Sequence, residues 1–182
     1  MQKIKSKPGL PNFFKTCPAP VRSYFAHLPQ LVEQFPLDVP LAYVFSQLEA
    51  AQVMALYCGV TKLHSAEKHI AWKAINAHHL TRGEFRAKFE AIYGKPIPET
   101  VIRLATVAEA VRDQVMQGKN ATDDNKRNAI AHALQSAIEI NGLCVALGGP
   151  RPVGDLRGYK GAGKPLPKST SRWVLRDIGF PA

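Results

Sequence analysis

The stretch that decides the fold is TDDNKRNAIAH, residues 122–132, because it opens the strongest helical pattern in the chain. Thr122 is a good N-cap, and the two aspartates after it complement the positive end of a helix dipole. Apolar residues then recur at helical spacing as far as Val145, which predicts a helix over 122–147 with one side on a core. The same spacing gathers polar side chains on the other side, with Arg127 at their edge: Asn128, His132, Gln135 and Glu139.

The sequence before this stretch repeats the same kind of pattern between ordinary helix start and stop signals. Thr81 and Glu84 have the spacing of a capping box, and Gly94 and Gly118 follow apolar helical runs. No alternating strand pattern of convincing length occurs, so the sequence predicts an all-α protein, a bundle of five or six helices over residues 20–147. The expected helices before the last one are 21–35 (interrupted by Pro29), 38–57, 65–79, 82–94 and 98–118.

The two ends of the chain differ from this helical region in composition. Residues 1–19 are basic and rich in proline, which predicts an irregular N-terminal arm. Residues 148–182 form a basic tail rich in glycine and proline, whose seven Lys and Arg face only Asp155 and Asp177. Because the tail ends in apolar residues, 171–179 are expected to form a short helix or turn. This segment would dock onto the bundle or onto a second subunit.

The formal charge of +10 on 182 residues is the strongest compositional signal. It favours nucleic acid or another polyanion as the partner. No apolar run reaches the length of a membrane span and no secretory signal is apparent, so we expect a cytoplasmic protein without a membrane partner. The three cysteines are widely spaced and are expected to be buried free thiols: Cys17, Cys58 and Cys144.

The segment RNAIAH, residues 127–132, resembles the Arg-Asn-x-x-x-His motif of HEPN-domain proteins. Those proteins are all-helical and often cleave RNA without a metal, so the resemblance implies no cofactor. It also implies a homodimer in which two motifs face each other. His132 would then act as general acid or base, Arg127 would stabilise the charge on the phosphorane, and Asn128 would orient the backbone or the imidazole.

A second segment, RDQVMQGK over residues 112–119, resembles another HEPN form, Arg-Asp-x-x-x-His-Gly. Gln117 stands where that form has histidine, and an amide cannot accept and return a proton near neutral pH. If this segment is the family's site, the protein is non-catalytic. The sequence alone leaves the choice between the two segments open.

Nucleic-acid binding, with RNA favoured over DNA, is expected to use basic residues near these motifs and in the tail. The alternative is a non-catalytic DNA-binding or scaffold protein that uses its basic surface for positioning. A helix-turn-helix over 65–93 is conceivable, although an ordinary helical hairpin is favoured. The residues expected to contact phosphate are Arg112, Lys119, Lys126, Arg157, Lys160, Lys164, Lys168 and Arg172.

Two other patterns are set aside. Residues 158–164 have the spacing of a phosphate loop, but Pro165 replaces the hydroxyl residue and no strand precedes them, so we expect no NTPase. The histidine pairs at 64/69 and 78/79 lack the i, i+4 spacing of a zinc helix and have no carboxylate cluster beside them. We therefore expect no metal site.

Overall fold

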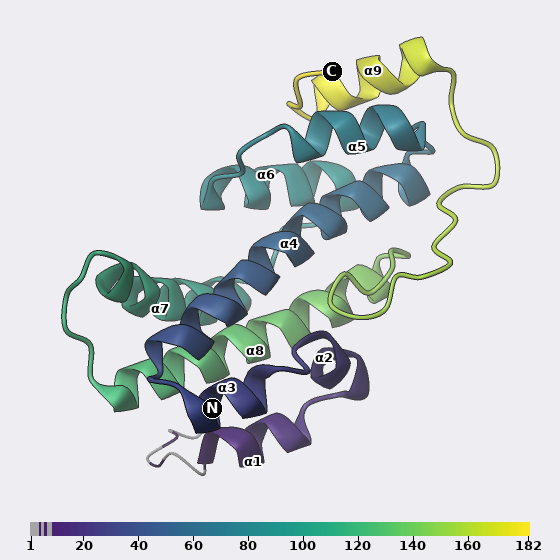
Figure 1. Ribbon diagram of the computed structural model, residues 1–182. Helices are drawn as coiled ribbons and strands as arrows, with labels where there is room; N and C mark the ends of the chain where they lie inside the picture. The colour runs from purple at the N-terminus through teal and green to yellow at the C-terminus, as the bar shows by residue number, and fades with distance from the viewer. Residues whose placement is uncertain (1–3, 5, 7–8) are drawn as a thin grey trace. The chain divides into compact units, whose positions relative to one another are not determined.

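The computed structural model describes residues 4, 6 and 9–182, which form nine helices and no strand (Figure 1). The expectation of an all-α protein is confirmed. The helices are, in chain order, α1 (Gly9–Thr16), α2 (Ala19–Tyr24), α3 (Leu28–Gln34), α4 (Asp38–Leu63), α5 (Lys68–Asn76), α6 (Arg82–Tyr93), α7 (Glu99–Met116), α8 (Asp123–Ala146) and α9 (Lys168–Asp177).

The expected number of five or six helices is not confirmed, and the extra helices lie at the ends of the chain. Part of the expected N-terminal arm is the helix α1, because Leu10 and Phe14, four positions apart, share one buried face. Residues 1–3, 5, 7 and 8 of that arm lie outside the described residues. The expected helix over 21–35 is two helices, α2 and α3, with Pro29 in the first turn of α3, where proline is tolerated.

The start and stop signals of the middle helices act mostly as the sequence indicates. Thr81 and Glu84 form both hydrogen bonds of a capping box at the start of α6, and Gly94 ends that helix with a φ of 70°. Ser65 does not start α5, because it takes a left-handed conformation with a φ of 56°. The carboxylate of Glu67 instead accepts hydrogen bonds from the amides of His69 and Ile70, so α5 begins at Lys68.

The chain divides into two compact units, and each has its own core. Unit 1 consists of residues 1–49, 98–140 and 153–155. Unit 2 consists of residues 50–97, 141–152 and 156–182. The helices α4 and α8 contribute their first parts to unit 1 and their last parts to unit 2.

The core of unit 1 combines large side chains from the N-terminal helices with small ones from α8. Phe25 is fully buried and Leu28 and Leu41 are 1% exposed. On α8, four alanines lie beside Ile130 and Leu134 in the same core: Ala129, Ala131, Ala133 and Ala137. Tyr24 closes one side of this core, since its hydroxyl donates a hydrogen bond to the carbonyl of Gln47 in α4.

The core of unit 2 brings α4 and α6 into close contact. A Cβ on Gly59 of α4 would lie 2.6 Å from Cγ2 of Ile92 and 2.9 Å from the ring of Tyr93, so only glycine fits there. The Tyr93 hydroxyl donates to the carbonyl of Ala55, and Phe89 is fully buried.

The apolar end of the tail packs within the same chain. The helix α9 lies against α5 (Figure 1), with Ser171 and Leu175 fully buried. Ser171 Oγ accepts a hydrogen bond of 2.9 Å from the amide of Glu67. Phe180 is 2% exposed, and Lys88 Nζ lies over its ring, 5.0 Å from the ring centroid. The tail therefore completes the core of unit 2.

Two helices, α4 and α8, are long and apolar enough to cross a membrane by length and composition. Each has an 18-residue window with a mean hydropathy of 1.2. The core helix of a soluble protein passes the same test of length and composition. Both α4 and α8 contribute buried residues to the cores described above.

Candidate functional site

Arg127, the expected transition-state cation, is neutralised within the first turns of α8. Its side chain is buried, and Nη2 donates to Oδ1 of Asp124. Its Nη1 lies 4.0 Å from Oδ2 of Asp123. Both carboxylates belong to the start of the same helix, where negative charge is favoured by the helix dipole. The charge of Arg127 is thus already paired inside unit 1.

Asn128 ties the N-terminal residues to α8. Its Oδ1 accepts a hydrogen bond of 2.9 Å from the amide of Ile4, and its Nδ2 donates to the carbonyl of Asp124 at 2.7 Å. Both ends of the amide are therefore occupied by the chain's own backbone.

His132 lies in a different environment from Arg127. The two are five positions apart, so they point about 140° away from each other around the helix. The His132 ring is half-buried, and among the described residues its buried Nδ1 has no hydrogen-bond partner. Burial lowers the pKa of the imidazole below its ordinary value of 6.5, which favours the neutral form at pH 7.

The structure brings His132 together with α7. An open hollow of about 360 Å³ is lined by His132 and one face of α7: Thr100, Arg103, Leu104 and Val107. Those four positions have the i, i+3, i+4, i+7 spacing of a helix face, which the sequence analysis did not single out. Arg103 is exposed, so the cation nearest the histidine's hollow is not the one in the motif.

The second motif carries no acid–base group. Arg112 donates to Oε1 of Glu49 at 2.7 Å and to Oδ1 of Asp113 at 2.9 Å, and its guanidinium lies over the ring of Phe45. Gln117 is the exposed C-cap of α7. The arrangement serves packing and pairing within unit 1.

The other expected phosphate contacts in unit 1 differ in exposure. Lys126 Nζ lies 2.5 Å from Oδ1 of Asp38, so this cation is also paired. Lys119 is exposed in the loop between α7 and α8. In unit 1, three of the predicted site cations therefore have carboxylate partners: Arg112, Lys126 and Arg127.

Charge is distributed very unevenly between the units. Unit 1 contains ten Lys and Arg and ten Asp and Glu, so its formal charge is zero. Unit 2 contains fourteen Lys and Arg and four Asp and Glu, so it carries the whole formal charge of +10. The basic partner-binding surface that composition predicts must be sought on unit 2.

The predicted tail cations are all on the surface of unit 2: Arg157, Lys160, Lys164, Lys168 and Arg172 are exposed. Two of the four carboxylates in this unit, Glu67 and Glu84, are helix caps. The exposed cations of unit 2 that lie within ion-pair distance of no described carboxylate include Lys62, Lys68, Lys73, Lys160, Lys164 and Arg172. The sequence analysis missed the first three, because they are far from the tail along the chain.

The tail segment 156–167 is held against the end of α4 and the start of α5. The Ala162 amide donates to the carbonyl of Thr61 at 3.0 Å, and the Leu166 amide donates to the carbonyl of Ser65 at 2.7 Å. The Tyr159 hydroxyl donates to the carbonyl of Cys58 at 2.7 Å and lies 2.9 Å from Thr61 Oγ1.

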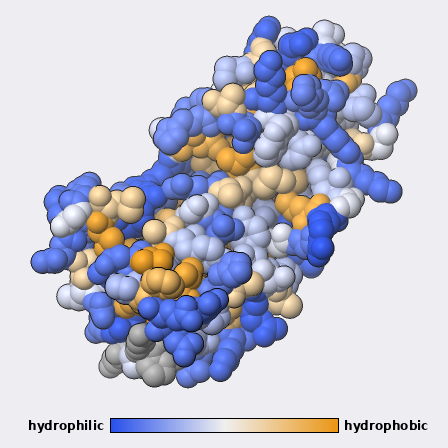
Figure 2. All heavy atoms as spheres, viewed as in Figure 1, coloured by the Kyte–Doolittle hydropathy of each residue, from blue (hydrophilic) through white to orange (hydrophobic). Residues whose placement is uncertain are grey.

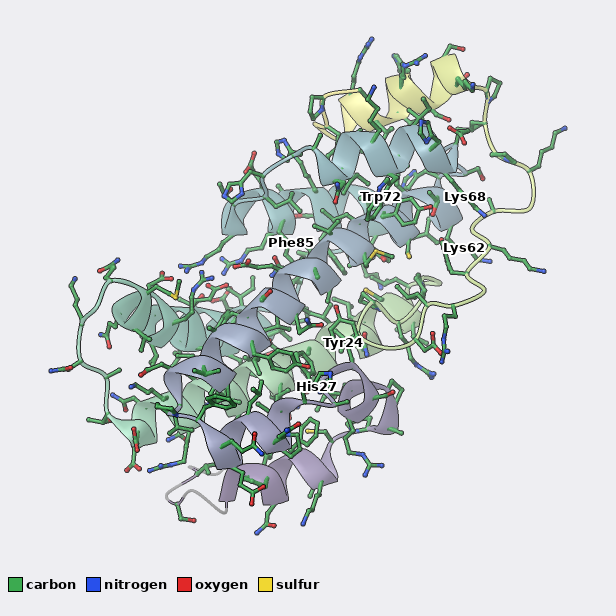
Figure 3. All side chains as sticks on the ribbon, in the orientation of Figure 1. Tyr24, His27, Lys62, Lys68, Trp72 and Phe85 are labelled. Carbon is green, nitrogen blue, oxygen red and sulfur yellow. The ribbon has the colours of Figure 1, made fainter. Side chains whose placement is uncertain are left out.

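This anchoring brings tail lysines to helical ones. Lys160 and Lys164 flank Ala162, whose partner Thr61 precedes Lys62. A Cβ on Gly161 would lie 3.3 Å from Cε of Lys68. Figure 3 shows Lys62, Lys68 and Trp72 at this junction, beside the tail segment. We call Lys62, Lys68, Lys160 and Lys164 the junction lysines.

The helix-turn-helix alternative does not fit α6 well. Lys88, a basic residue of the helix that would read the bases, is 7% exposed and lies against Phe180. A recognition helix needs free side chains in its N-terminal half. Figure 2 shows mainly hydrophilic residues over α9 on the face that it presents.

The cysteines offer no chemistry. All three are buried free thiols, and burial raises the pKa of Cys17 and of Cys144 to about 11 and that of Cys58 to about 12.

Among the described residues no group of three or more His, Cys, Asp or Glu could hold a metal ion.

No protein-family model, curated protein sequence or solved structure matches the chain. The resemblance of residues 127–132 to HEPN proteins therefore stays a prediction, and function has to be argued from the geometry of the chain itself.

Proposed function

We propose that this protein binds nucleic acid through the surface of unit 2, with RNA favoured over DNA because of the resemblance at residues 127–132. The observation that supports this is the charge division: unit 2 holds the whole charge of +10, and the six exposed cations named above are among those of its cations that have no carboxylate partner. Each cation that contacts a phosphate releases a condensed counterion, which favours binding at low salt. The paired cations of unit 1 offer no such gain.

The test is the salt dependence of binding to a labelled 20-nucleotide RNA, followed by fluorescence anisotropy between 50 and 200 mM KCl. If all six cations contact phosphate, the slope of log K against log salt is roughly −4 for a single strand. Replacing Lys160 and Lys164 with glutamine makes that slope shallower by about 1.4. The matched control replaces two exposed cations of unit 1, Lys15 and Arg22, and leaves the slope unchanged.

Equal losses in the two double variants would overturn the assignment to unit 2, because total charge would then govern the affinity. Absence of binding at 50 mM KCl would overturn nucleic-acid binding altogether and favour the scaffold alternative. A DNA strand of the same sequence, measured in parallel, tests the preference for RNA.

Metal-independent RNA cleavage is a second candidate, supported by the state of His132. His132 lines the hollow and its lowered pKa favours the neutral imidazole, so a ring nitrogen that reaches the hollow can accept the proton of a ribose 2′-hydroxyl. The 2′-oxygen then attacks phosphorus, and the bond to the 5′-oxygen breaks as that oxygen takes a proton. The products are a 2′,3′-cyclic phosphate and a 5′-hydroxyl end. Arg103, which lines the same hollow, would stabilise the charge on the phosphorane, whereas Arg127 would first have to leave its ion pair with Asp124.

Incubation with RNA in EDTA tests this candidate. We expect cleavage by the wild type and by His69→Ala, an exposed histidine of unit 2, and none by His132→Ala. Arg103→Gln and Arg127→Ala then identify the cation that acts. Sedimentation in the ultracentrifuge tests the homodimer that the resemblance implies. Cleavage that persists in His132→Ala would exclude the histidine as the acid–base group.

A further inference from the structure

We infer that Trp72 and the junction lysines bind unpaired nucleotides, with the indole stacking on a base and the lysines contacting the adjacent phosphates. This inference rests on the proposed function and narrows it to single-stranded nucleic acid. It concerns α5, the end of α4 and the tail segment 156–167, all of which belong to unit 2.

Trp72 is exposed in a way that core packing does not explain. Both tryptophans of the chain lie in unit 2 and both are exposed, Trp72 at 42% and Trp173 at 68%. A large aromatic ring in water forgoes the burial that stabilises most tryptophans. Trp72 stands on the exposed side of α5, at helical spacing with three polar residues: His69, Lys73 and Asn76.

Trp72 is also held in place, unlike a freely turning surface side chain. Its ring makes an edge contact with Tyr57, with centroids 5.5 Å apart, and Tyr57 makes a similar contact with Tyr159 at 6.5 Å. Tyr159 is fixed in turn by its hydrogen bonds to α4. A preorganised ring loses little side-chain entropy when a base stacks on it. Trp173 makes no such ring contact among the described residues.

The charges around Trp72 match a sugar–phosphate backbone. Lys68 precedes Trp72 by four positions, which places both on one side of α5, and its stem touches the segment that carries Lys160. The carboxylate that directly precedes Lys68, that of Glu67, is engaged with the amides of α5, and these hydrogen bonds lower its pKa. A strip of lysines beside an aromatic ring is the arrangement by which single strands are bound without sequence readout.

A lipid surface fits this region less well. Insertion into a membrane interface needs a continuous apolar face. The exposed side of α5 offers one indole among lysine, histidine and asparagine. Stacking needs only one ring face for each base, so the observed composition favours nucleotides.

The experiment uses tryptophan fluorescence in the full-length protein. Trp173→Phe leaves Trp72 as the sole tryptophan, and a stacked base quenches its emission. Titration with a 12-nucleotide uridine RNA should quench Trp72 strongly, whereas a blunt RNA duplex of equal charge should not. In the reciprocal variant, Trp72→Phe, the remaining Trp173 should change little with the single strand.

Affinity for the single strand gives the second readout. Trp72→Ala should weaken it by about five- to 150-fold, the usual effect of removing one stacking ring. Trp72→Phe, which keeps a ring, should retain most of the binding, and Trp173→Ala is the matched control. Unchanged far-UV circular dichroism shows that the variants are folded.

The outcomes separate this inference from the proposed function. If single strand and duplex bind equally well and Trp72→Ala matters to neither, nucleic-acid binding stands and stacking at Trp72 is wrong. If Trp173 is quenched in place of Trp72, the base stacks on the indole of α9 and this inference is wrong. If neither nucleic acid binds at 50 mM KCl, the proposed function fails as well. Quenching only by vesicles of anionic phospholipid would replace the nucleotide by a membrane.

Discussion

The two units of this protein use charge in opposite ways. Unit 1 has ten cations and ten carboxylates, and its buried or half-buried cations are paired, as Arg127 is with Asp124 and Arg112 with Glu49. Unit 2 has the same kind of helices but only four carboxylates for fourteen cations. The buried and half-buried cations of unit 1 thus contribute to internal structure, and the excess of positive charge is presented to solvent in unit 2.

This difference shows why net charge alone is a poor guide to a binding surface. The expected phosphate contacts were chosen by position near a motif or in the tail, and those in unit 1 turned out to be mostly paired. A cation within reach of a carboxylate has already lost much of its attraction for phosphate. The relevant quantity is the number of unpaired exposed cations in one unit.

The largest effect on stability is expected when a paired cation of unit 1 is removed. Arg127→Ala should lower the free energy of unfolding by about 2 kcal/mol, because it removes a buried side chain together with its ion pairs. Lys164→Ala, which removes an unpaired cation of unit 2, should change it by less than about 0.5 kcal/mol. Urea unfolding followed by far-UV circular dichroism measures both.

Fluorescence adds a test of which unit responds. Both tryptophans lie in unit 2, so their emission follows that unit while circular dichroism follows both. If Arg127→Ala left the unfolding transitions measured by fluorescence and by circular dichroism unchanged, the ion pairs of Arg127 would contribute nothing to stability. The contrast between the units would then fail.

A smaller effect is expected at the helix caps of unit 2. Thr81→Ala removes the capping-box hydroxyl of α6 and should cost about 1 kcal/mol. Thr122→Ala provides the counterpart in unit 1, since Thr122 Oγ1 accepts from the Asn125 amide at 3.2 Å. Similar losses at the two positions would show that helix caps contribute alike in both units, and that only the paired cations differ.

The carboxylate of that capping box predicts a pH dependence. Hydrogen bonds from Thr81, together with His78, lower the pKa of Glu84 to about 2. Because the folded-state pKa is below the ordinary 4.5, the contribution of Glu84 is present above pH 4.5 and is lost as the pH falls towards 2. Glu84→Gln should remove part of the acid sensitivity in that window, measured as the thermal midpoint at several pH values. An unchanged pH profile would contradict this role.

The smallest effect is expected at His132 in unit 1. Burial lowers the pKa of this imidazole below 6.5, so the unfolded chain binds a proton more readily than the folded one. Its burial therefore costs no stability above pH 6.5 and costs progressively more as the pH falls below it. His132→Gln should flatten the loss of stability between pH 7 and pH 5. A steeper loss in the variant would show that the histidine is protonated and paired in the folded protein.

Local signals predicted much of the helical structure. The acidic first turn of α8, the capping box of α6 and the glycine stops at Gly94 and Gly118 act between neighbours in sequence, so they could be read without a fold. The start of α5 was placed at Ser65, three residues early. Ser65 takes a left-handed conformation, and its carbonyl accepts a hydrogen bond from the amide of Leu166, which is distant in sequence.

The candidate site depends more on distant contacts. The motif at residues 127–132 was visible, but the burial of Arg127 and the position of Arg103 beside His132 follow from how α7 and α8 pack. The junction lysines come from two stretches about a hundred residues apart, joined by hydrogen bonds between the tail and α4. Such pairings leave no periodic pattern in the sequence.

By itself, the sequence determined that the chain is all-α and that it carries a charge of +10, because helical periodicity and composition are local or additive properties. Only the tertiary structure decided which cations are paired, that α9 and Phe180 complete the core of unit 2, and that Trp72 stays on the surface of the unit that holds the junction lysines. Those outcomes depend on which surfaces bury each other, and burial is a property of the whole fold.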